Sequence, residues 1–209
     1  MENIIYYCGN IVSGTKLAQA VYDLMVMSDK DFIPPLSDRS SATKTLAEQS
    51  DDYIYYYPVV DHYYEIILGQ KNIIALVDEK IVAFMSFRHD FEKKFYFPTE
   101  ANANDKINYV TTLCANPDYR GRGLAKDLYD FIENKLPKEV WADCVATRTW
   151  HTNESHIKIL QKRGYKLTCT LHKERFDKVG FYNQSPESKP REEFFLDTVY
   201  YCKSLHRKQ

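Results

Sequence analysis

The stretch that decides the fold reads Leu113-Cys114-Ala115-Asn116-Pro117-Asp118-Tyr119-Arg120-Gly121-Arg122-Gly123-Leu124-Ala125-Lys126. Two of the seven glycines of the chain, Gly121 and Gly123, fall here between a predicted strand and a predicted helix. Glycine lets the backbone turn without a Cβ in the way, and the first amides of a helix have no intrahelical acceptor. We therefore expect the loop to bind an anion such as a phosphate or pyrophosphate, helped by the helix dipole and by the cationic side chains Arg120, Arg122 and Lys126.

Two common nucleotide-binding motifs do not match this loop. A P-loop ends in Gly-Lys-Ser/Thr, and this loop has Gly123-Leu124-Ala125. A Rossmann fingerprint needs a third Gly or Ala where Lys126 stands. What remains is Arg-x-x-Gly-x-Ala, formed by Arg120, Gly123 and Ala125. This pattern resembles the pyrophosphate-binding motif of the GNAT superfamily of acyl-CoA-dependent N-acyltransferases.

Three other segments support the resemblance. Residues 75–84 look like the central hairpin of the family, and Asn153 with Gly164-Tyr165 looks like its later helix. Residues 198–203 resemble its terminal strand. The resemblance covers about residues 72–205, whereas residues 1–70 match only as generic helices. The length of 209 residues and the absence of a composition break predict one domain over residues 1–209.

Hydrophobic periodicity predicts the elements of this domain. The expected helices are 13–27, 59–68, 124–136 and 154–163, and the expected strands are 72–77, 81–87, 107–113, 140–147, 165–172 and 198–205. The first third of the chain is thus expected to be helical with loops. The order of elements predicts an α/β (α+β) fold. The resemblance implies a mixed, mostly antiparallel sheet of about six to seven strands flanked by helices and splayed at the strand that ends near Ala115.

Composition narrows the class of protein. The 209 residues carry 28 Lys and Arg against 29 Asp and Glu, a net charge of −1. This balance gives no bulk electrostatic reason to bind nucleic acid or an anionic membrane. Every apolar run is too short to cross a membrane. Five widely spaced cysteines without a C-x-x-C pair indicate neither a disulfide framework nor a zinc site, and they suggest a reducing, cytoplasmic location: Cys8, Cys114, Cys144, Cys169 and Cys202.

The resemblance implies acetyl-CoA as the acyl donor, no metal, and direct transfer of the acetyl group to a primary amine. The main chain of Leu113, Cys114 and Ala115 would bind pantetheine and polarise the thioester carbonyl. Asn153 would hydrogen-bond the pantetheine arm from the opposite side. The pyrophosphate would be bound by a run of seven residues: Arg120, Gly121, Arg122, Gly123, Leu124, Ala125 and Lys126.

The sequence departs from the family pattern at the residues that move protons. Many members have a Tyr seven residues after the Asn to protonate the leaving thiolate, and Leu160 stands there. Some members have a Glu in the strand before the loop, roughly where Tyr109 lies. The remaining candidates are Tyr109 for a proton relay through water, and Ser155 or His156 for the thiolate. A noncatalytic acyl-CoA-binding or sensing module, and an acyl-enzyme route through Cys114, stay open as alternatives.

The acceptor is a small-molecule or peptide amine, and the sequence does not select between them. Residues 53–64 are rich in Tyr beside Asp51, Asp52 and Asp61, a combination that could form a pocket for a cationic amine. Both a monomer and a homodimer are compatible with the sequence, the latter if the C-terminal strand lies at a sheet edge and pairs with a second copy.

Overall fold

The structure is a computed structural model that describes residues 3–32, 64, 67–92, 101, 104–178 and 192–205. Its centre is a seven-stranded sheet in the order β1-β2-β3-β4-β5-β7-β6. The strands are β1 (Ile5–Asn10), β2 (Lys71–Val77), β3 (Lys80–Arg88), β4 (Ile107–Ala115), β5 (Cys144–Trp150), β6 (Lys166–Lys178) and β7 (Glu192–Ser204). Only the β4–β5 pair is parallel within this sheet. The predicted mixed, mostly antiparallel sheet is therefore confirmed.

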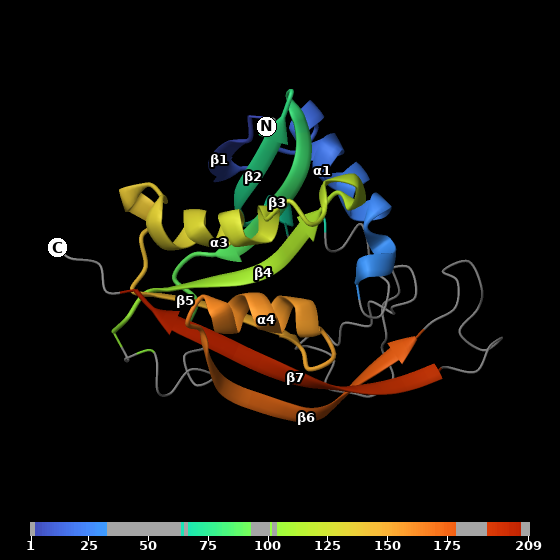
Figure 1. Cartoon of the computed structure of the whole chain (residues 1–209), viewed down its shortest axis with the longest axis vertical. Helices are drawn as coiled ribbons and strands as arrows, with labels where there is room; N and C mark the ends of the chain where they lie inside the picture. The colour runs from blue at the N-terminus through green and yellow to red at the C-terminus, as the bar shows by residue number, and fades with distance from the viewer. Residues whose placement is uncertain are drawn as a thin grey trace, which may run out of the picture.

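Helices cover both faces of the sheet. They are α1 (Lys16–Met27), α3 (Leu124–Asn134) and α4 (Glu154–Lys162), and Figure 1 shows α3 and α4 lying across the front of the sheet. Side chains alternate between the faces along a strand. Ile73 of β2 accordingly packs in the core with α3 and α4, whereas Ile74 packs in a second core with α1. No helix in the described ranges is long and apolar enough to cross a membrane.

The hairpin between β2 and β3 turns within two residues. Val77 pairs with Lys80, so the loop consists of Asp78 and Glu79 alone, one residue shorter than the sequence predicted. Both have left-handed backbones, with φ of 48° and 63°. Such turns match the right-handed twist of the strands, but they strain any residue with a Cβ.

A β-bulge distorts β4 beside the site described below. Ser86 pairs with Thr112 and Phe87 with Val110, so Thr111 is the extra residue. The Thr111 hydroxyl lies 2.5 Å from Gln70 Oε1 and 3.2 Å from the Ser86 carbonyl oxygen. Because a bulge shifts alternation by one residue, it changes which side chains of β4 face each core. The Thr111 hydrogen bonds hold this shift in place.

The N-terminal strand, the start of β5 and the position of β7 in the sheet differ from the prediction. Residues 5–10 form β1, which the sequence reading missed, and β5 begins at Cys144 because Lys138–Val140 is a 3-10 turn. β7 lies between β5 and β6, so the expectation that the C-terminal strand is an edge strand is wrong. Most of the expected helix 59–68 falls outside the described residues. One domain over residues 1–209 stays a prediction.

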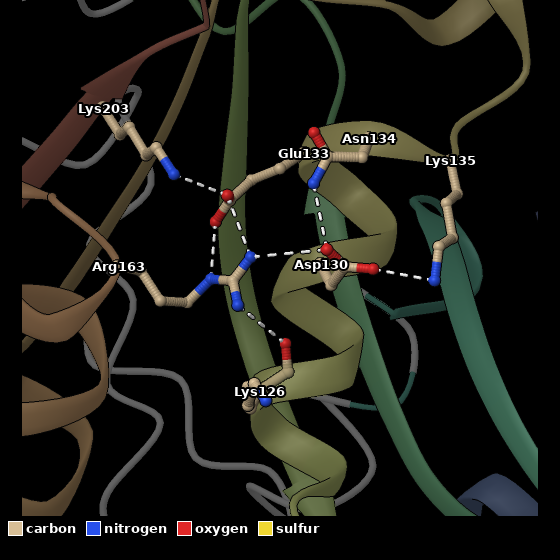
Figure 2. A network of polar contacts seen from close by, with 7 residues as sticks. All are labelled: Lys126, Asp130, Glu133, Asn134, Lys135, Arg163 and Lys203. Carbon is tan, nitrogen blue, oxygen red and sulfur yellow. Dashed lines mark hydrogen bonds and ion pairs between the residues drawn. The ribbon is translucent and has the colours of Figure 1, made fainter.

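A buried carboxylate joins α3 to the end of α4 and to β7 (Figure 2). The Glu133 side chain is only 3% exposed, and its two oxygens accept from Arg163 Nε and Nη2 at 2.8 and 2.9 Å. Lys203 Nζ lies 2.6 Å from Oε2. Arg163 Nη1 also donates to the Lys126 carbonyl oxygen at 3.3 Å, in the first turn of α3. This network sets the position of α3 relative to α4.

Replacing Glu79 by Gly is expected to increase the free energy of unfolding by about 1 kcal/mol, because glycine adopts the left-handed conformation without strain. Urea unfolding measures the change. Lys80→Gly is the matched control, since Lys80 begins β3 and should lose stability instead. Equal destabilisation by both substitutions would contradict the strained-turn account.

Glu133→Gln should lower the free energy of unfolding by about 3 kcal/mol, because it leaves two cations beside a neutral buried group. Glu154→Gln removes one partner of the exposed Glu154–Lys158 pair and should change stability by less than about 0.5 kcal/mol. Thermal and urea unfolding of the two variants would show whether burial makes this difference. Similar small losses in both would mean that the network does not fix α3 to α4.

Candidate active site

The site begins where β4 and β5 stop pairing. Their ladder runs only from Ile107–Cys144 to Val110–Thr147, although β4 continues to Ala115 and β5 to Trp150. The separated ends border a cleft of about 530 Å³, lined by residues 110–115 and 147–150. The splay that the family resemblance implied near Ala115 is present, and it starts at Val110.

Each of the two strands keeps its other neighbour beyond the split. β4 stays paired with β3 as far as Ala115, and β5 stays paired with β7 as far as Trp150. At the split, the Thr147 hydroxyl donates to the Val110 carbonyl oxygen at 3.1 Å. On its cleft side, the main chain of residues 111–115 therefore has no strand partner among the described residues, so its polar groups can bind a ligand.

The glycine loop lies at the end of β4 and forms the start of α3. Gly121 and Gly123 have φ of 74° and 87°, and a Cβ on either would meet no heavy atom of the described chain within 4 Å. Gly123 is the N-cap of α3 and provides no side-chain cap. The first amides of α3 thus face open space at the positive end of the helix, which is the chemistry that binds phosphate. This arrangement fits the pyrophosphate of CoA.

The cationic side chains of the loop do not all turn toward the cleft. Arg120 lines it and forms an ion pair with Asp31, which follows α1. Arg122 instead lies over the Tyr119 ring, with 4.5 Å between the guanidinium carbon and the ring centroid. Lys126 is exposed. Of the predicted loop residues, Arg120 and Ala125 line the cleft, while Leu124 is 3% exposed and anchors α3 in the core.

The three predicted β4 residues all line the cleft, but the thiol between them is buried. Leu113 and Ala115 pack against the core of α3 and α4, and Cys114 packs against α1. The Cys114 sulfur lies 3.8 Å from the Leu24 carbonyl oxygen. Burial raises the pKa of the Cys114 thiol to about 11. A thiol held neutral in this way is a poor nucleophile.

The N-terminus of α4 forms the opposite wall. Asn153 caps the helix: its Oδ1 accepts from the His156 amide at 3.3 Å and from the Ser155 hydroxyl at 3.2 Å. Its Nδ2 is the group that can donate to a ligand. Asn153, Ser155 and His156 all line the cleft. The roles that the resemblance implied, Asn153 on the pantetheine arm and Ser155 or His156 at the thiolate, stay predictions.

His156 is joined to a tyrosine that the sequence analysis did not select. His156 Nε2 lies 2.8 Å from the hydroxyl of Tyr129, a fully buried residue of α3. Burial lowers the pKa of His156 to about 4. Its imidazole is therefore neutral near pH 7 and is not an imidazolium donor there. Tyr129 and His156 are 27 residues apart in the sequence, and the sequence pattern indicates only that Tyr129 lies on the core face of an amphipathic helix.

Of the three proton-transfer candidates, only Tyr109 does not line the cleft. Tyr109 is 7% exposed and stacks on Phe91 with 4.2 Å between ring centroids. A role for it as a relay stays a prediction. Leu160, where the family resemblance would place a tyrosine, is fully buried in the core. Past the end of α1, Ser28, Asp31 and Phe32 border the cleft, whereas the tyrosines of residues 53–63 are outside the described residues.

Comparisons with known proteins agree with this geometry. Residues 39–165 match the family model for the acetyltransferase (GNAT) family. An N-acetyltransferase from Staphylococcus aureus superposes with a TM-score of 0.56 at 15% identity, over 97% of this chain and 99% of that one. NAA60 from Arabidopsis thaliana, in complex with acetyl-CoA, superposes with a TM-score of 0.60 at 14% identity, over 98% and 100%.

The ribosomal-protein-S18-alanine N-acetyltransferase from Escherichia coli gives a TM-score of 0.56 at 11% identity, over 98% of this chain and 97% of that one. At such identities, these likenesses show the shared fold. No curated protein matches the sequence.

The buried, neutral Cys114 thiol predicts that the protein forms no acetyl-cysteine when mixed with acetyl-CoA. Intact-mass analysis before and after hydroxylamine treatment detects such a thioester. A hydroxylamine-labile acetyl group that Cys114→Ala removes would contradict this prediction and support the acyl-enzyme route.

Proposed function

Because this chain belongs to the acetyltransferase (GNAT) family, we propose that it transfers the acetyl group of acetyl-CoA directly to a primary amine. The observation that carries the proposal is the split between β4 and β5 next to the uncapped start of α3. One part supplies main-chain groups without a strand partner on the cleft side, and the other supplies an anion site. Acetyl-CoA needs both, since it combines a pyrophosphate with an amide-containing arm and a thioester.

Main-chain and side-chain groups divide the binding. The amides that begin α3 at Gly123 and Leu124 hold the pyrophosphate, with Arg120 as the nearest cation in the cleft wall. The main chain of β4 binds the pantetheine arm at Leu113, Cys114 and Ala115. The arm thereby pairs with the side of β4 that does not face β3, as a neighbouring strand would. Asn153 Nδ2 donates to the arm from α4. Arg122 and Lys126 contribute through the electrostatic field of the loop.

Acetyl-CoA supplies an activated acyl group, and the protein supplies position and donors. The amine nitrogen attacks the carbonyl carbon, the carbon–sulfur bond breaks, and the nitrogen loses one proton. Main-chain N–H groups on the free edge of β4 stabilise the negative charge that develops on the carbonyl oxygen. Such donors contribute about 3–4 kcal/mol in other acyl-transfer enzymes. Tyr109 does not line the cleft, so it takes up the amine proton only through intervening water, whereas Ser155 lies in the cleft wall.

The acceptor is a primary amine on a small molecule or a peptide. It enters past the segment after α1, where Phe32 provides an aromatic surface for a cationic amine, while the Asp31 carboxylate is paired with Arg120. One structural relative acts on the alanine of a ribosomal protein, and another was solved with a bisubstrate analogue ending in the peptide MVNAL. Both relatives support a peptide as one acceptor to test. The proposed setting is cytoplasmic, as a monomer or homodimer.

Calorimetric titration with acetyl-CoA tests the cofactor claim. The unmodified protein should bind, and Gly123→Glu should weaken binding by at least about 100-fold, because a carboxylate then occupies and repels the anion site. Gly14→Glu is the matched control: Gly14 also has a positive φ, of 76°, with nothing within 4 Å of a Cβ. It should bind like the unmodified protein. Absence of binding by the unmodified protein, or equal binding by Gly123→Glu, would overturn the proposal.

Release of free CoA thiol with a panel of amines and peptides separates an enzyme from a noncatalytic acyl-CoA sensor. The sensor remains the alternative because Leu160 stands where the family resemblance would place the phenol of a tyrosine. An enzyme releases thiol only with its acceptor present. Tight binding without release for any amine would favour the sensor.

A further inference from the structure

His156 and Leu160 differ in whether their side chains reach the cleft. The two positions are one turn apart on the same face of α4. Side chains of a helix lean toward its N-terminus, so a tyrosine at 160 would reach across the turn that begins at 156. Leu160 is too short to reach and stays fully buried, while His156 lines the cleft. On this face of α4, the imidazole of His156 is therefore the polar group that reaches the cleft one turn before Leu160.

The partner of this imidazole comes from the other helix of the cleft. The Tyr129 hydroxyl lies 2.8 Å from Nε2, and the ring centroids are 5.8 Å apart. Thr147 is a second polar neighbour of the phenol, but its own hydroxyl proton is directed to the Val110 carbonyl oxygen at 3.1 Å. The Thr147 oxygen can also accept from the phenol, but the ring nitrogen of a neutral imidazole is a stronger acceptor than a hydroxyl oxygen, so the Tyr129 hydroxyl donates to His156 Nε2, 2.8 Å away.

The direction of this hydrogen bond decides which nitrogen of His156 carries the proton. When Tyr129 donates to Nε2, Nε2 is the unprotonated nitrogen and Nδ1 carries the hydrogen. Burial keeps both groups uncharged, because it lowers the pKa of His156 and raises that of the Tyr129 phenol. The dipole at the start of α4 also disfavours an imidazolium. With Nε2 occupied, Nδ1 is the ring nitrogen that a bound molecule can use.

We propose that Tyr129 is a positioning residue that holds His156 in its Nδ1–H form, so that His156 donates a hydrogen bond to the cofactor sulfur as the thiolate leaves. The inference rests on the proposed transfer from acetyl-CoA. When the carbon–sulfur bond breaks, its electron pair goes to sulfur, and Nδ1–H stabilises that charge without transferring its proton. Solvent then protonates the thiolate or takes up the proton that the amine has lost. The pair thus stabilises the leaving thiolate by a hydrogen bond, and protonation of the sulfur is left to solvent.

The thiol of bound CoA reports this interaction without any acceptor. The ultraviolet absorbance of the thiolate, followed against pH in the CoA complex, gives its fraction. A hydrogen bond to a charged group should make that fraction about tenfold larger in the unmodified protein than in His156→Ala at the same pH. His156→Asn, whose amide nitrogen matches Nδ1, should retain most of the effect. His156→Gln, whose amide matches Nε2, should lose it.

Tyr129→Phe tests the positioning role. Nitrogen-15 spectra of histidine-labelled protein should show a protonated Nδ1 for His156 in the unmodified protein and a loss of that preference in the variant. The thiolate fraction of bound CoA should fall with it. Tyr6→Phe is the matched control, because it also removes a phenol hydrogen bond to α3, the one to Asp127, on a side away from His156. It should change neither readout.

The outcomes separate this inference from the proposed function. If CoA does not bind the unmodified protein, the proposed function itself fails. If CoA binds but His156 is protonated at Nε2, or if His156→Ala leaves the thiolate fraction unchanged, the inference fails and the transfer proposal stands. Should Tyr129→Phe not fold, the Asn and Gln replacements of His156 decide the question by themselves.

Discussion

The parting of two parallel strands after the Val110–Thr147 pair is the constraint on which the rest of the molecule depends. Parallel strands that remained paired would satisfy each other's main-chain groups and leave no edge for a ligand. Here β4 remains hydrogen-bonded to β3 and β5 remains hydrogen-bonded to β7, so both strands stay in the sheet although they part from each other. The Thr147 hydroxyl closes the end of the ladder on the Val110 carbonyl oxygen. The opening is thus a consequence of sheet pairing, and no mobile loop is needed to make it.

Two helices turn this opening into a site of defined width. α3 presents its uncapped start beside the end of β4, and α4 presents Asn153 and His156 across from it. Their separation is set deep in the core by Leu124 and Tyr129, and at the far end by the Glu133 carboxylate between Arg163 and Lys203 (Figure 2). Buried, fully paired charges are costly to rearrange. The cleft is therefore largely formed before any ligand arrives, which lowers the entropic cost of binding.

Local signals in the sequence predicted the glycine loop, the central hairpin, and the helices α1, α3 and α4, because each is specified within one short segment. The strand β1 was missed since Ile5–Asn10 is a six-residue edge strand with a weak burial pattern, defined mainly by its pairing with β2. The Arg120–Asp31 and Tyr129–His156 contacts join residues far apart in sequence, so no local pattern indicates them. The bulge at Thr111 likewise depends on Gln70 and Ser86, which come from other strands or turns. Those contacts supply the chemical detail of the site.

The structure of the protein in complex with CoA tests the central claim most directly. The account predicts the pyrophosphate against the amides of Gly123 and Leu124, and the pantetheine arm between the separated ends of β4 and β5. Asn153 Nδ2 should donate to the arm, and the thiol should lie within hydrogen-bond distance of His156 Nδ1. A complex with CoA bound elsewhere, or with β4 and β5 paired beyond Val110, would contradict it.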